Sequence, residues 1–573
     1  MRLRAFLLPA LAVSAGLGVY VVRSHANPPG DALYTQTDRN EWISYARVIR
    51  LEHSGSANGR LLATFERWHG NADPTTFLIQ QSLDDGHTWA ALANVSDGET
   101  GPTHPWPVMW QPFLFELPRR LGRYPAGTLL LAGNVCPKGI PESHFQLWRS
   151  ADHGATWQYV STFQKGGSVS PGRGIWEPYL ALDKRGRLVC YFSDERQSEK
   201  YSQFLGHIVS EDGGDTWGPE VMDVASASQP DRPGMATVAR LRDGTYLMSY
   251  EICGPLGCEV RVKASRDGDT WGDAPTDLGT RPETTDGRYL VGSPYLVRAS
   301  GPGRDGRLML AAHEARLVTG GVAPETGQVV FLNANSGQGQ WSWMPAPFKP
   351  AYEPRGHTNP VYSPCLLPSS DGKSLRVTVP SGGEPSSQER TGTGPADILP
   401  YTDRFAAGSD AGWIDYAGDW SVRDGEYRVA AGNGEARAIA GSTGWTDYTV
   451  SADIKLASPG EAGLLFRVTD PNASAYHGYA VRLSSRDGTL CLMAPGTQAP
   501  PTSVAVPGGI AAGVWYHMTA KANGSVLEAS LQREGARDGT SRVRATDSAS
   551  PMGAIGLNSW STACSWKNVR VGK

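Results

Sequence analysis

Two glutamates, Glu177 and Glu251, each lie at one end of a short apolar stretch, in the sequences IWEPYLAL and YLMSYEIC. Apolar surroundings disfavour an ionised carboxyl group, so its pKa rises and it can hold a proton near neutral pH. Two such groups side by side suit glycoside cleavage, in which one protonates the leaving oxygen and the other attacks carbon or activates water. A glutamate chosen blindly is more often a solvated surface charge. The interpretation therefore depends on a fold that brings both residues together.

A sixfold repeat supplies such a fold. Each repeat contains an apolar, strand-like run, then a glycine, and then a second apolar run. Units of roughly sixty residues that contain only strand-like patterns are typical of β-propellers. The sequence thus predicts an all-β, six-bladed β-propeller over residues 31–382, with residues 31–44 supplying an outer strand that closes the ring. The repeat glycines are Gly59, Gly127, Gly186, Gly244, Gly306 and Gly372.

Residues at one offset from each repeat glycine should point the same way, because side chains alternate along a strand. In a propeller, the second strand of each blade ends at the face where the innermost strand begins. We therefore expect two sets of residues to line one shared polar pocket. Seven residues past the glycines lie Glu66, Asn134, Ser193, Glu251, His313 and Val379. Just before the innermost strands lie Gln111, Glu177, Arg232, Ser293 and Tyr362.

A second motif, S-x-D-x-G-x-T-W, occurs three times, and a fourth copy is one residue shorter. Its Ser and Asp side chains are suited to bind turn amides, its Gly to adopt positive φ, and its Trp to pack between sheets. We interpret these residues as structural and not catalytic. The motif resembles the Asp box of sialidase-like propellers. The copies span Ser82 to Trp89, Ser150 to Trp157, Ser210 to Trp217 and Ser265 to Trp271.

Within an Asp-box propeller, GIWEPYLAL and YLMSYEICG resemble glycoside hydrolase family 93 over residues 35–382. Members of that family are exo-acting α-1,5-L-arabinanases that release arabinobiose from linear arabinan with retention of configuration. The resemblance implies that Glu177 is the nucleophile and Glu251 the acid/base. It also implies a role for a tyrosine late in the propeller, for which Tyr362 is our candidate and Tyr352 the weaker choice.

Retention implies carboxyl groups about 5 Å apart, whereas about 8 Å or more would favour inversion. We expect neither a metal nor another cofactor. The expected partner is a polysaccharide or oligosaccharide of arabinan type, and the expected oligomeric state is a monomer. Further candidates for substrate binding are Glu66, Trp68, Asp73, Asn134, Trp176, Arg232, His313 and His357.

The composition changes after the propeller. A Gly/Ser/Pro/Thr-rich stretch predicts a linker over residues 383–400, and alternating strands about ten residues apart predict a β-sandwich over residues 401–573. The sandwich resembles the concanavalin-like jelly rolls attached to glycan-active enzymes. Two interpretations stay open, a carbohydrate-binding module and a packing domain, because this architecture serves both.

The first 26 residues have the layout of a secretory signal. Arg2 and Arg4 precede an apolar run from Ala5 to Val22, and Ser24-His25-Ala26 offers a cleavage site. We expect a secreted, extracellular protein with no membrane attachment after cleavage; an uncleaved anchor is the alternative. The net charge of −4 offers no basic field for nucleic acid.

Seven cysteines suit an oxidising compartment. Cys253 and Cys258 flank a Gly-Pro-Leu-Gly turn and are expected to close a small loop. Cys491 and Cys564 form a possible second pair, because no other cysteine lies in the C-terminal region. The remaining cysteines include Cys190 and Cys365, which lie in strand patterns and are expected to be buried thiols.

Two other functions compete with arabinan hydrolysis. A sialidase shares the fold and the Asp boxes, but binds the substrate carboxylate with three arginines and has an early Arg-Ile-Pro. Here ARVIRL stands in that place, with Arg47 and Arg50, while Arg232 and Arg355 lie near the predicted rim. The second alternative is a glycan-binding protein without catalysis, in which Glu177 and Glu251 would be too far apart to act together.

Overall fold

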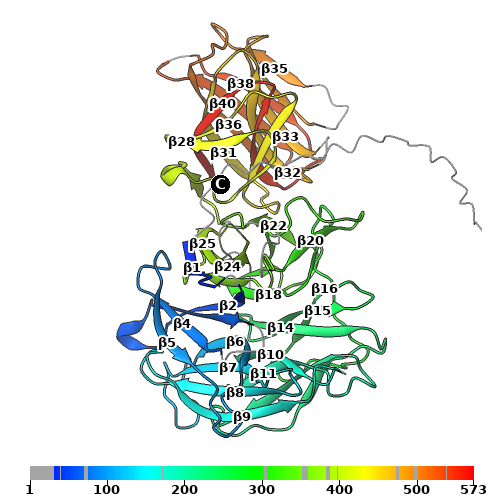
Figure 1. The fold of residues 1–573 in the computed structure, drawn as a ribbon. Coiled ribbons are helices and arrows are strands. Elements are labelled where there is room, and N and C mark those ends of the chain that lie inside the picture. Colours follow the sequence, from blue (N-terminus) through cyan, green and yellow to red (C-terminus); the bar gives the residue numbers. More distant parts are fainter. Residues whose placement is uncertain are drawn as a thin grey trace, which may run out of the picture.

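The computed structural model describes residues 31–573 except 39, 70–74, 171, 302, 304–305, 351–358, 383–387, 397, 473–475, 496–500 and 537–538. The predicted signal segment, residues 1–26, lies outside the described residues. Figure 1 shows a ring of small sheets, with a two-sheet domain stacked against one side of it. Two short 3₁₀ helices, Gly55–Ala57 and Ala406–Gly408, accompany the strands. No described helix is long and apolar enough to cross a membrane.

The ring is a six-bladed β-propeller, and each blade is an antiparallel sheet. From the axis outwards, blade one is β2 (Trp42–Arg50), β3 (Leu61–Trp68), β4 (Phe77–Ser82) and β5 (Ala90–Val95); blade two is β6 (Val108–Glu116), β7 (Leu129–Cys136), β8 (Ser143–Ser150) and β9 (Gln158–Gly166); blade three is β10 (Ile175–Leu182), β11 (Leu188–Asp194), β12 (Phe204–Ser210) and β13 (Val221–Val224).

The other three blades continue this order. Blade four is β14 (Arg232–Arg240), β15 (Tyr246–Cys253), β16 (Glu259–Ser265) and β17 (Arg288–Val291), with β20 (Glu314–Leu317) added at its edge; blade five is β18 (Tyr295–Ala299), β19 (Arg307–Ala311), β21 (Val329–Asn333) and β22 (Ser342–Pro345); blade six is β23 (Cys365–Pro368), β24 (Ser374–Ser381), β25 (Gln388–Pro395) and β1 (Asp31–Thr35).

Strand β1 closes the ring by pairing antiparallel with β25, with Asp31 opposite Thr391. The N-terminal segment therefore supplies the outer strand of blade six, as the sequence predicted. The predicted linker over residues 383–400 is wrong in part, because residues 388–395 form β25. Its glycines are required by packing: a Cβ on Gly392 would lie 2.5 Å from the ring of Phe348, and one on Gly394 2.7 Å from Pro347. A composition typical of linkers here belongs to a tightly packed strand.

The Asp boxes lie where the third strand of a blade ends, on the face opposite the predicted polar pocket. In blade three, Asp212 Oδ1 accepts hydrogen bonds from the Ser210 hydroxyl at 2.8 Å and the Thr216 backbone at 2.9 Å. Gly214, at φ +98°, donates its N–H to the Ser210 hydroxyl at 2.8 Å. These bonds hold the turn, which agrees with a structural role for the motif.

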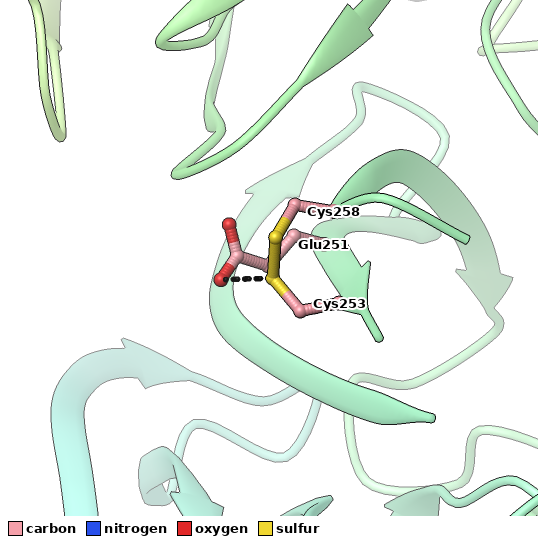
Figure 2. Close-up of side chains that lie close together, drawn as sticks. All are labelled: Glu251, Cys253 and Cys258. Atoms are coloured by element: carbon pink, nitrogen blue, oxygen red, sulfur yellow. Dashed lines mark hydrogen bonds between the residues drawn. A yellow bond between two sulfur atoms is a disulfide. The ribbon is translucent and has the colours of Figure 1, made fainter. Parts of the chain in front are cut away.

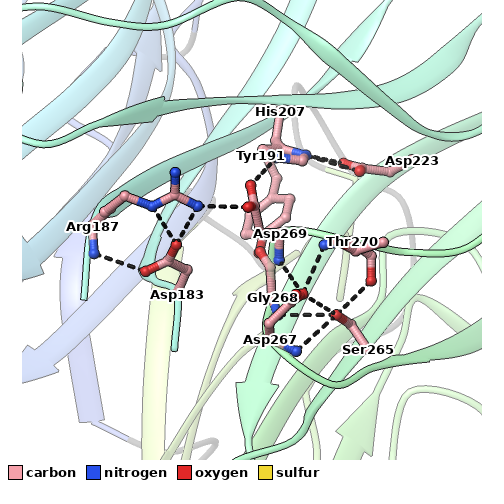
Figure 3. A network of polar contacts seen from close by, with 10 residues as sticks. All are labelled: Asp183, Arg187, Tyr191, His207, Asp223, Ser265, Asp267, Gly268, Asp269 and Thr270. Atoms are coloured by element: carbon pink, nitrogen blue, oxygen red, sulfur yellow. Dashed lines mark hydrogen bonds and ion pairs between the residues drawn. The ribbon is translucent and has the colours of Figure 1, made fainter. Parts of the chain in front are cut away.

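A polar network joins blades three and four beside the fourth Asp box (Figure 3). Asp269 pairs with Arg187 at 2.6 Å and with His207 at 3.3 Å, and His207 Nδ1 lies 2.8 Å from Asp223 Oδ1. Burial lowers the pKa of His207, but the two aspartates outweigh it and raise the pKa overall. The network therefore stabilises the packing of neighbouring blades.

The C-terminal domain is a sandwich of two antiparallel sheets around one apolar core. The β40 sheet contains β28 (Trp420–Arg423), β29 (Glu426–Val429), β40 (Cys564–Gly572), β31 (Tyr448–Leu456), β36 (Trp515–Asn523), β37 (Val526–Arg533) and β38 (Ser541–Thr546), with β26 (Tyr401–Asp403) on β40. The β39 sheet contains β27 (Trp413–Ala417), β30 (Glu435–Ala440), β39 (Ala554–Trp560), β32 (Glu461–Thr469), β33 (His477–Ser484), β34 (Thr489–Met493) and β35 (Thr502–Ala505).

The cysteine predictions have mixed outcomes. Cys253 and Cys258 form a disulfide, and Cys190 and Cys365 are buried thiols, as predicted. The predicted Cys491–Cys564 pair is wrong, because both thiols are free. Cys564 lies on β40 in the sandwich core, whereas Cys491 lies on the other sheet, opposite Arg482 on the outer face, so the two sulfur atoms cannot meet.

Candidate active site

A strained backbone position recurs near the start of every innermost strand. A residue other than glycine adopts positive φ there, and in blades one to four the ladder shifts register beside it. Such conformations cost free energy and are concentrated at functional sites. The six residues, with φ from 39° to 63°, are Tyr45, Gln111, Glu177, Met235, Ser293 and Ser363. The equivalents of Glu177 in blades four and six are therefore Met235 and Ser363, and not Arg232 and Tyr362 as the sequence alignment of blades predicted.

The residues seven past the repeat glycines hold these strained positions. Glu66 Oε2 accepts the backbone N–H of Gln111 at 3.1 Å, and Glu251 Oε2 accepts that of Ser293 at 2.6 Å. The Ser193 hydroxyl accepts the N–H of Met235 at 3.1 Å. Each of these side chains therefore reaches from one blade to the bulge of the next. Because this contact recurs, the residues seven positions after the repeat glycines lie on the same face of the ring.

Glu177 lies at the centre of this arrangement and accepts a hydrogen bond on each carboxyl oxygen. The Ser193 hydroxyl donates to Oε2 at 2.5 Å, and Gln111 Nε2 donates to Oε1 at 3.4 Å. Gln111 Oε1 in turn accepts the backbone N–H of Glu177 at 3.0 Å. Burial raises the pKa of Glu177 to about 8, and the charges of Glu251 and Glu195 contribute to the rise. The carboxyl groups of Glu177 and Glu251 are thus close enough to influence each other's ionisation.

Glu251 lies beside the disulfide (Figure 2). Its Oε1 is 3.3 Å from Cys253 Sγ, but a disulfide sulfur has no proton to donate, so the contact does not stabilise a negative charge as a hydrogen bond would. Burial raises the pKa of Glu251 to about 6. Glu251, Cys253 and Cys258 would offer three ligand atoms within 4.8 Å of one another, yet the sulfur–sulfur bond removes the thiolates that a metal would need.

Tyr362 closes the site from blade six. Its hydroxyl donates to Met235 Sδ at 3.6 Å, and its ring lies edge-on to His313, with centroids 6.0 Å apart. Burial raises the pKa of Tyr362 well above its usual value, and the charges of Glu251 and Glu177 add to this, as do Tyr45 and Glu66. These acidic groups, from blades one, three and four, therefore lie around the Tyr362 side chain of blade six. Burial also lowers the pKa of His313, which favours its neutral form.

An aromatic row borders the same rim. Trp68, Trp110 and Trp176 follow one another across blades one to three, with ring centroids 5.6 Å and 6.4 Å apart. All three are half-buried, so part of each ring faces solvent. Exposed faces of aromatic rings suit the C–H faces of sugars, and Trp68 and Trp176 are among the residues predicted to bind substrate.

Other predicted residues lie elsewhere or serve the scaffold. Asn134 is completely buried, and its Nδ2 donates to the Ile175 carbonyl at 2.8 Å, so it positions β10 and does not face the pocket. Arg232 is partly exposed, pairs with Glu195 and donates from Nη2 to Gln203 at 2.7 Å; its charge lowers the pKa of Glu251 against the rise that burial causes, so it lies near the rim. The remaining candidates Asp73, His357 and Tyr352 lie outside the described residues.

Two residues near the carboxyl pair were not among the sequence candidates. Glu195, from the loop after β11, is buried and contributes to the raised pKa of Glu177. Tyr45 is buried, and the guanidinium of Arg47 lies 4.0 Å from its ring. Tyr45 occupies the blade-one equivalent of Glu177 and could have been found by aligning Tyr45-Ala46 with Glu177-Pro178; no sequence repeat marks Glu195.

Comparisons with known proteins agree with this geometry. The chain is similar to the glycoside hydrolase family 93 α-L-arabinofuranosidase of Fusarium graminearum, solved with arabinobiose, at 26% identity and a TM-score of 0.54, covering 64% of this chain and 97% of that one. It is similar to the α-L-arabinanase of Penicillium chrysogenum, also solved with arabinobiose, at 28% identity and a TM-score of 0.54, covering 64% and 98%.

The sandwich has a different relationship. Residues 403–572 match the family model of the 3-keto-α-glucoside-1,2-lyase-like domain. A search of the curated proteins found no match to the chain. The propeller and the sandwich thus have separate resemblances, and only the first concerns the carboxyl pair. The N-terminal propeller of this chain is therefore similar to arabinan-type glycoside hydrolases that include a family 93 enzyme.

Proposed function

We propose that this protein is a retaining glycoside hydrolase that releases arabinobiose from the ends of linear α-1,5-arabinan. The observation that carries the proposal is the pair Glu177 and Glu251, two half-buried carboxyl groups at the same rim of adjacent blades, with the charge of Glu251 contributing to the raised pKa of Glu177. The family 93 resemblance supplies the substrate, since two similar enzymes were solved with arabinobiose. The aromatic row provides surfaces on which sugar rings can stack.

In the proposed mechanism, Glu251 protonates the departing glycosidic oxygen while Glu177 attacks the anomeric carbon and forms a glycosyl-enzyme. Glu251 then removes a proton from water, which attacks the same carbon and releases Glu177. Both carboxyl groups return to their starting state, and configuration is retained after two inversions. We expect the two carboxyl groups about 5 Å apart in the substrate complex.

Hydrogen bonding supports this division of roles. Glu177 accepts donors on both oxygens, from Ser193 and Gln111, which favours its ionised, nucleophilic form. Glu251 accepts the Ser293 N–H on Oε2, while among the described residues no N–H or O–H donates to its Oε1, which can carry the proton. Burial favours the opposite assignment of the proton, because it raises the pKa of Glu177 to about 8 and that of Glu251 to about 6. Substrate binding must therefore move the shared proton to Glu251.

Tyr362 is assigned a supporting catalytic role. Its hydroxyl lies against Met235, the blade-four equivalent of Glu177, and its pKa responds to both carboxyl groups. Because that pKa is well above the usual value, Tyr362 stays protonated and can donate a hydrogen bond to Glu177 or to a sugar oxygen. His313 packs edge-on against the ring and limits its movement.

Azide rescue distinguishes this assignment from its reverse. With an aryl α-L-arabinoside whose leaving group needs no protonation, a Glu251→Ala enzyme should still form the glycosyl-enzyme, and azide should yield the α-azide. A Glu177→Ala enzyme should instead give the β-azide, because azide attacks from the vacated face. The opposite pair of products would exchange the two roles. Absence of turnover of linear arabinan by the unaltered enzyme would contradict the proposal itself.

A sialidase activity is less well supported. Arg47, the early arginine, is buried and bonds to Ser363, and Arg50 pairs with the Asp-box residue Asp85 at 2.7 Å. Arg232 is engaged by Glu195. These arginines are therefore committed to protein partners instead of gathering around a substrate carboxylate. Sialyl-lactose serves as the control substrate, and its cleavage in place of arabinan would favour the sialidase.

Glycan binding without catalysis would require the carboxyl groups to act independently. Their position at one rim of adjacent blades, and the contribution of the Glu251 charge to the raised pKa of Glu177, favour joint action instead. We further propose that the protein is secreted, because residues 1–26 have the layout of a signal and the proposed substrate is a polysaccharide. We also propose that it is a monomer. Detection of the mature protein in culture medium, and its mass in solution, test both points.

A further inference from the structure

The outer face of the β39 sheet carries polar and aromatic side chains in register. Trp560 on β39 lies opposite Glu435 on β30 and Glu461 on β32. Two residues before Trp560 on β39, Asn558 lies opposite Arg437 on β30. Residues directly opposite or two apart share a face of a sheet, so these side chains project together. The alternate residues of the same strands, including Ala436, Ala438 and Leu557, form the sandwich core.

Contacts among these residues make a preorganised cluster. Glu435 Oε1 accepts hydrogen bonds from Arg482 Nη2 and from Asn558 Nδ2, each at 2.8 Å. The guanidinium of Arg482 lies 5.8 Å from the ring of Trp560. Trp560 is 46% exposed and is one of few exposed large apolar residues in the part of the chain that the structure describes. An open aromatic surface therefore adjoins fixed polar groups.

The polar groups of this cluster are incompletely used. Asn558 is completely buried, yet its Oδ1 has no hydrogen-bond partner within the part of the chain that the structure describes. Arg482 Nε is likewise buried and has no hydrogen-bond partner within the described residues. Both residues donate to the same oxygen of Glu435, so the cluster keeps hydrogen-bonding capacity beyond the contacts that the protein itself supplies. A sugar hydroxyl, which both donates and accepts, is the type of group that such a cluster can bind.

The charges of the face define the ligand class. Glu435 and Glu461 balance Arg437 and Arg482, so the face has no net charge to attract a polyanion. We propose that it binds a neutral sugar residue with adjacent hydroxyl groups. Trp560 stacks against the sugar ring, while Glu435 and Arg482, whose side chains keep some exposure, hydrogen-bond to the hydroxyls.

The site is fixed relative to the propeller. The backbone of Trp343 in blade five exchanges hydrogen bonds with Thr443 of the sandwich, at 2.9 Å to Oγ1 and 3.0 Å from N–H to carbonyl. Ile414 of the sandwich packs within a propeller core cluster, and Lys349 bridges to Asp410 and Asp415 at 3.1 Å and 3.0 Å. A polymer held on this face would thus stay attached to the enzyme between encounters with the propeller.

Affinity electrophoresis of the full chain tests the proposal. Every protein carries Glu177→Gln to prevent digestion of the gel, which contains linear arabinan, xylan, laminarin, inulin or the acidic polymer polygalacturonate. We expect at least one neutral polysaccharide to retard the parent. Adding Trp560→Ala or Glu435→Gln should raise its dissociation constant at least about tenfold, as loss of a stacking or charged hydrogen-bonding group predicts. Retardation left in both variants is assigned to the propeller.

Trp515→Ala is the matched control, because this indole lies on the other sheet with Lys455 and Lys567 at 4.4 Å and 4.2 Å. It should migrate like the parent, and thermal unfolding checks that each variant is folded. No retardation by any polysaccharide, equal retardation of the parent and Trp560→Ala, or stronger binding of polygalacturonate would overturn the proposal. Because binding is measured without turnover, the result is independent of whether the propeller cleaves arabinan.

Discussion

The two faces of the propeller use the same residue types in opposite ways. On the Asp-box face, hydrogen bonds from turn residues outweigh burial and lower the pKa values of Asp152, Asp212 and Asp267. On the rim, burial outweighs the available donors and raises the pKa values of Glu177 and Glu251. The first group is held in its charged state, whereas the second stays close to the pH at which a proton can be exchanged.

The backbone shows the same contrast. Positive φ on the Asp-box face falls mostly on glycines such as Gly154 and Gly214, which adopt it at little cost. On the rim it falls on Tyr45, Gln111 and Glu177, for which it is strained. One repeat thus contains a relaxed end that stabilises the ring and a strained end that aims side chains at its axis.

Removing either rim carboxyl should produce the largest effect. Glu251→Gln should lower kcat/KM on linear arabinan by about 10²- to 10⁴-fold, because an amide cannot donate a proton to the leaving group. Glu177→Gln should cost at least as much, since it removes the nucleophile. Asp84→Asn on the Asp-box face is the control and should keep its kcat/KM. A similar loss in all three variants would abolish the distinction between the faces.

The disulfide beside Glu251 should come next. Replacing Cys253 and Cys258 with serine frees the loop between them, and misplacement of a catalytic group by about 1 Å can cost up to about 10²-fold. We therefore expect kcat to fall by about 10- to 10²-fold, with the enzyme still folded by circular dichroism. Cys491→Ser, in the sandwich, is the matched control. Unchanged kcat in the double variant would show that the rim does not need this restraint.

The coupled carboxyl pair should give a bell-shaped pH profile. With pKa values of about 6 and about 8, the pair holds one proton between these limits, which is the state that double displacement requires. We expect kcat/KM to be greatest near pH 7 and to fall by about tenfold per pH unit beyond each limb. A profile that stays flat from pH 5 to pH 9 would exclude the pair as the titrating groups.

Asp212→Asn should affect stability and not catalysis. The variant loses acceptors for the Thr216 N–H and hydroxyl, so we expect the free energy of unfolding to fall by about 1–2 kcal/mol, allowing for partial exposure. The lowered folded pKa means that this stabilisation is present above the unfolded pKa and is lost as the pH falls through the folded value. Thermal unfolding at pH 7 and pH 3 measures it, and a larger loss at pH 3 would contradict it.

Glu177→Gln should increase stability at high pH, in contrast to Asp212→Asn, and this is the smallest effect that we expect. A carboxyl group with a raised folded pKa stabilises the fold below its unfolded pKa, and this contribution is lost as the pH rises through about 8. The amide does not ionise, so the variant should gain about 1 kcal/mol relative to the unaltered enzyme at pH 9. Calorimetry at pH 5 and pH 9 tests this difference. A variant less stable at pH 9 would place Glu177 with the structural carboxylates.

Much of the fold follows from local pattern. The repeat glycines, the Asp boxes and the alternating apolar runs determine the six-bladed ring, because each signals a turn or a strand within a few residues. The offset of seven from each glycine identified Glu66, Ser193 and Glu251 as side chains at one face of the ring, where the structure shows each of them bonded to the neighbouring blade. The Cys253–Cys258 disulfide could also be predicted from the sequence, because the two cysteines are only five residues apart.

Other features depend on contacts between distant segments. In the sequence, Gly392 and Gly394 are typical of a linker, and only the structure shows that Phe348 and Pro347 pack against them. Arg232 and Tyr362 were aligned with Glu177 because the register shifts that select Met235 and Ser363 are visible only in the paired strands. The sequence by itself determined which blade supplies each carboxyl group. Only the closed ring decided their pKa values and neighbours, because burial and coupling arise between residues that are remote along the chain.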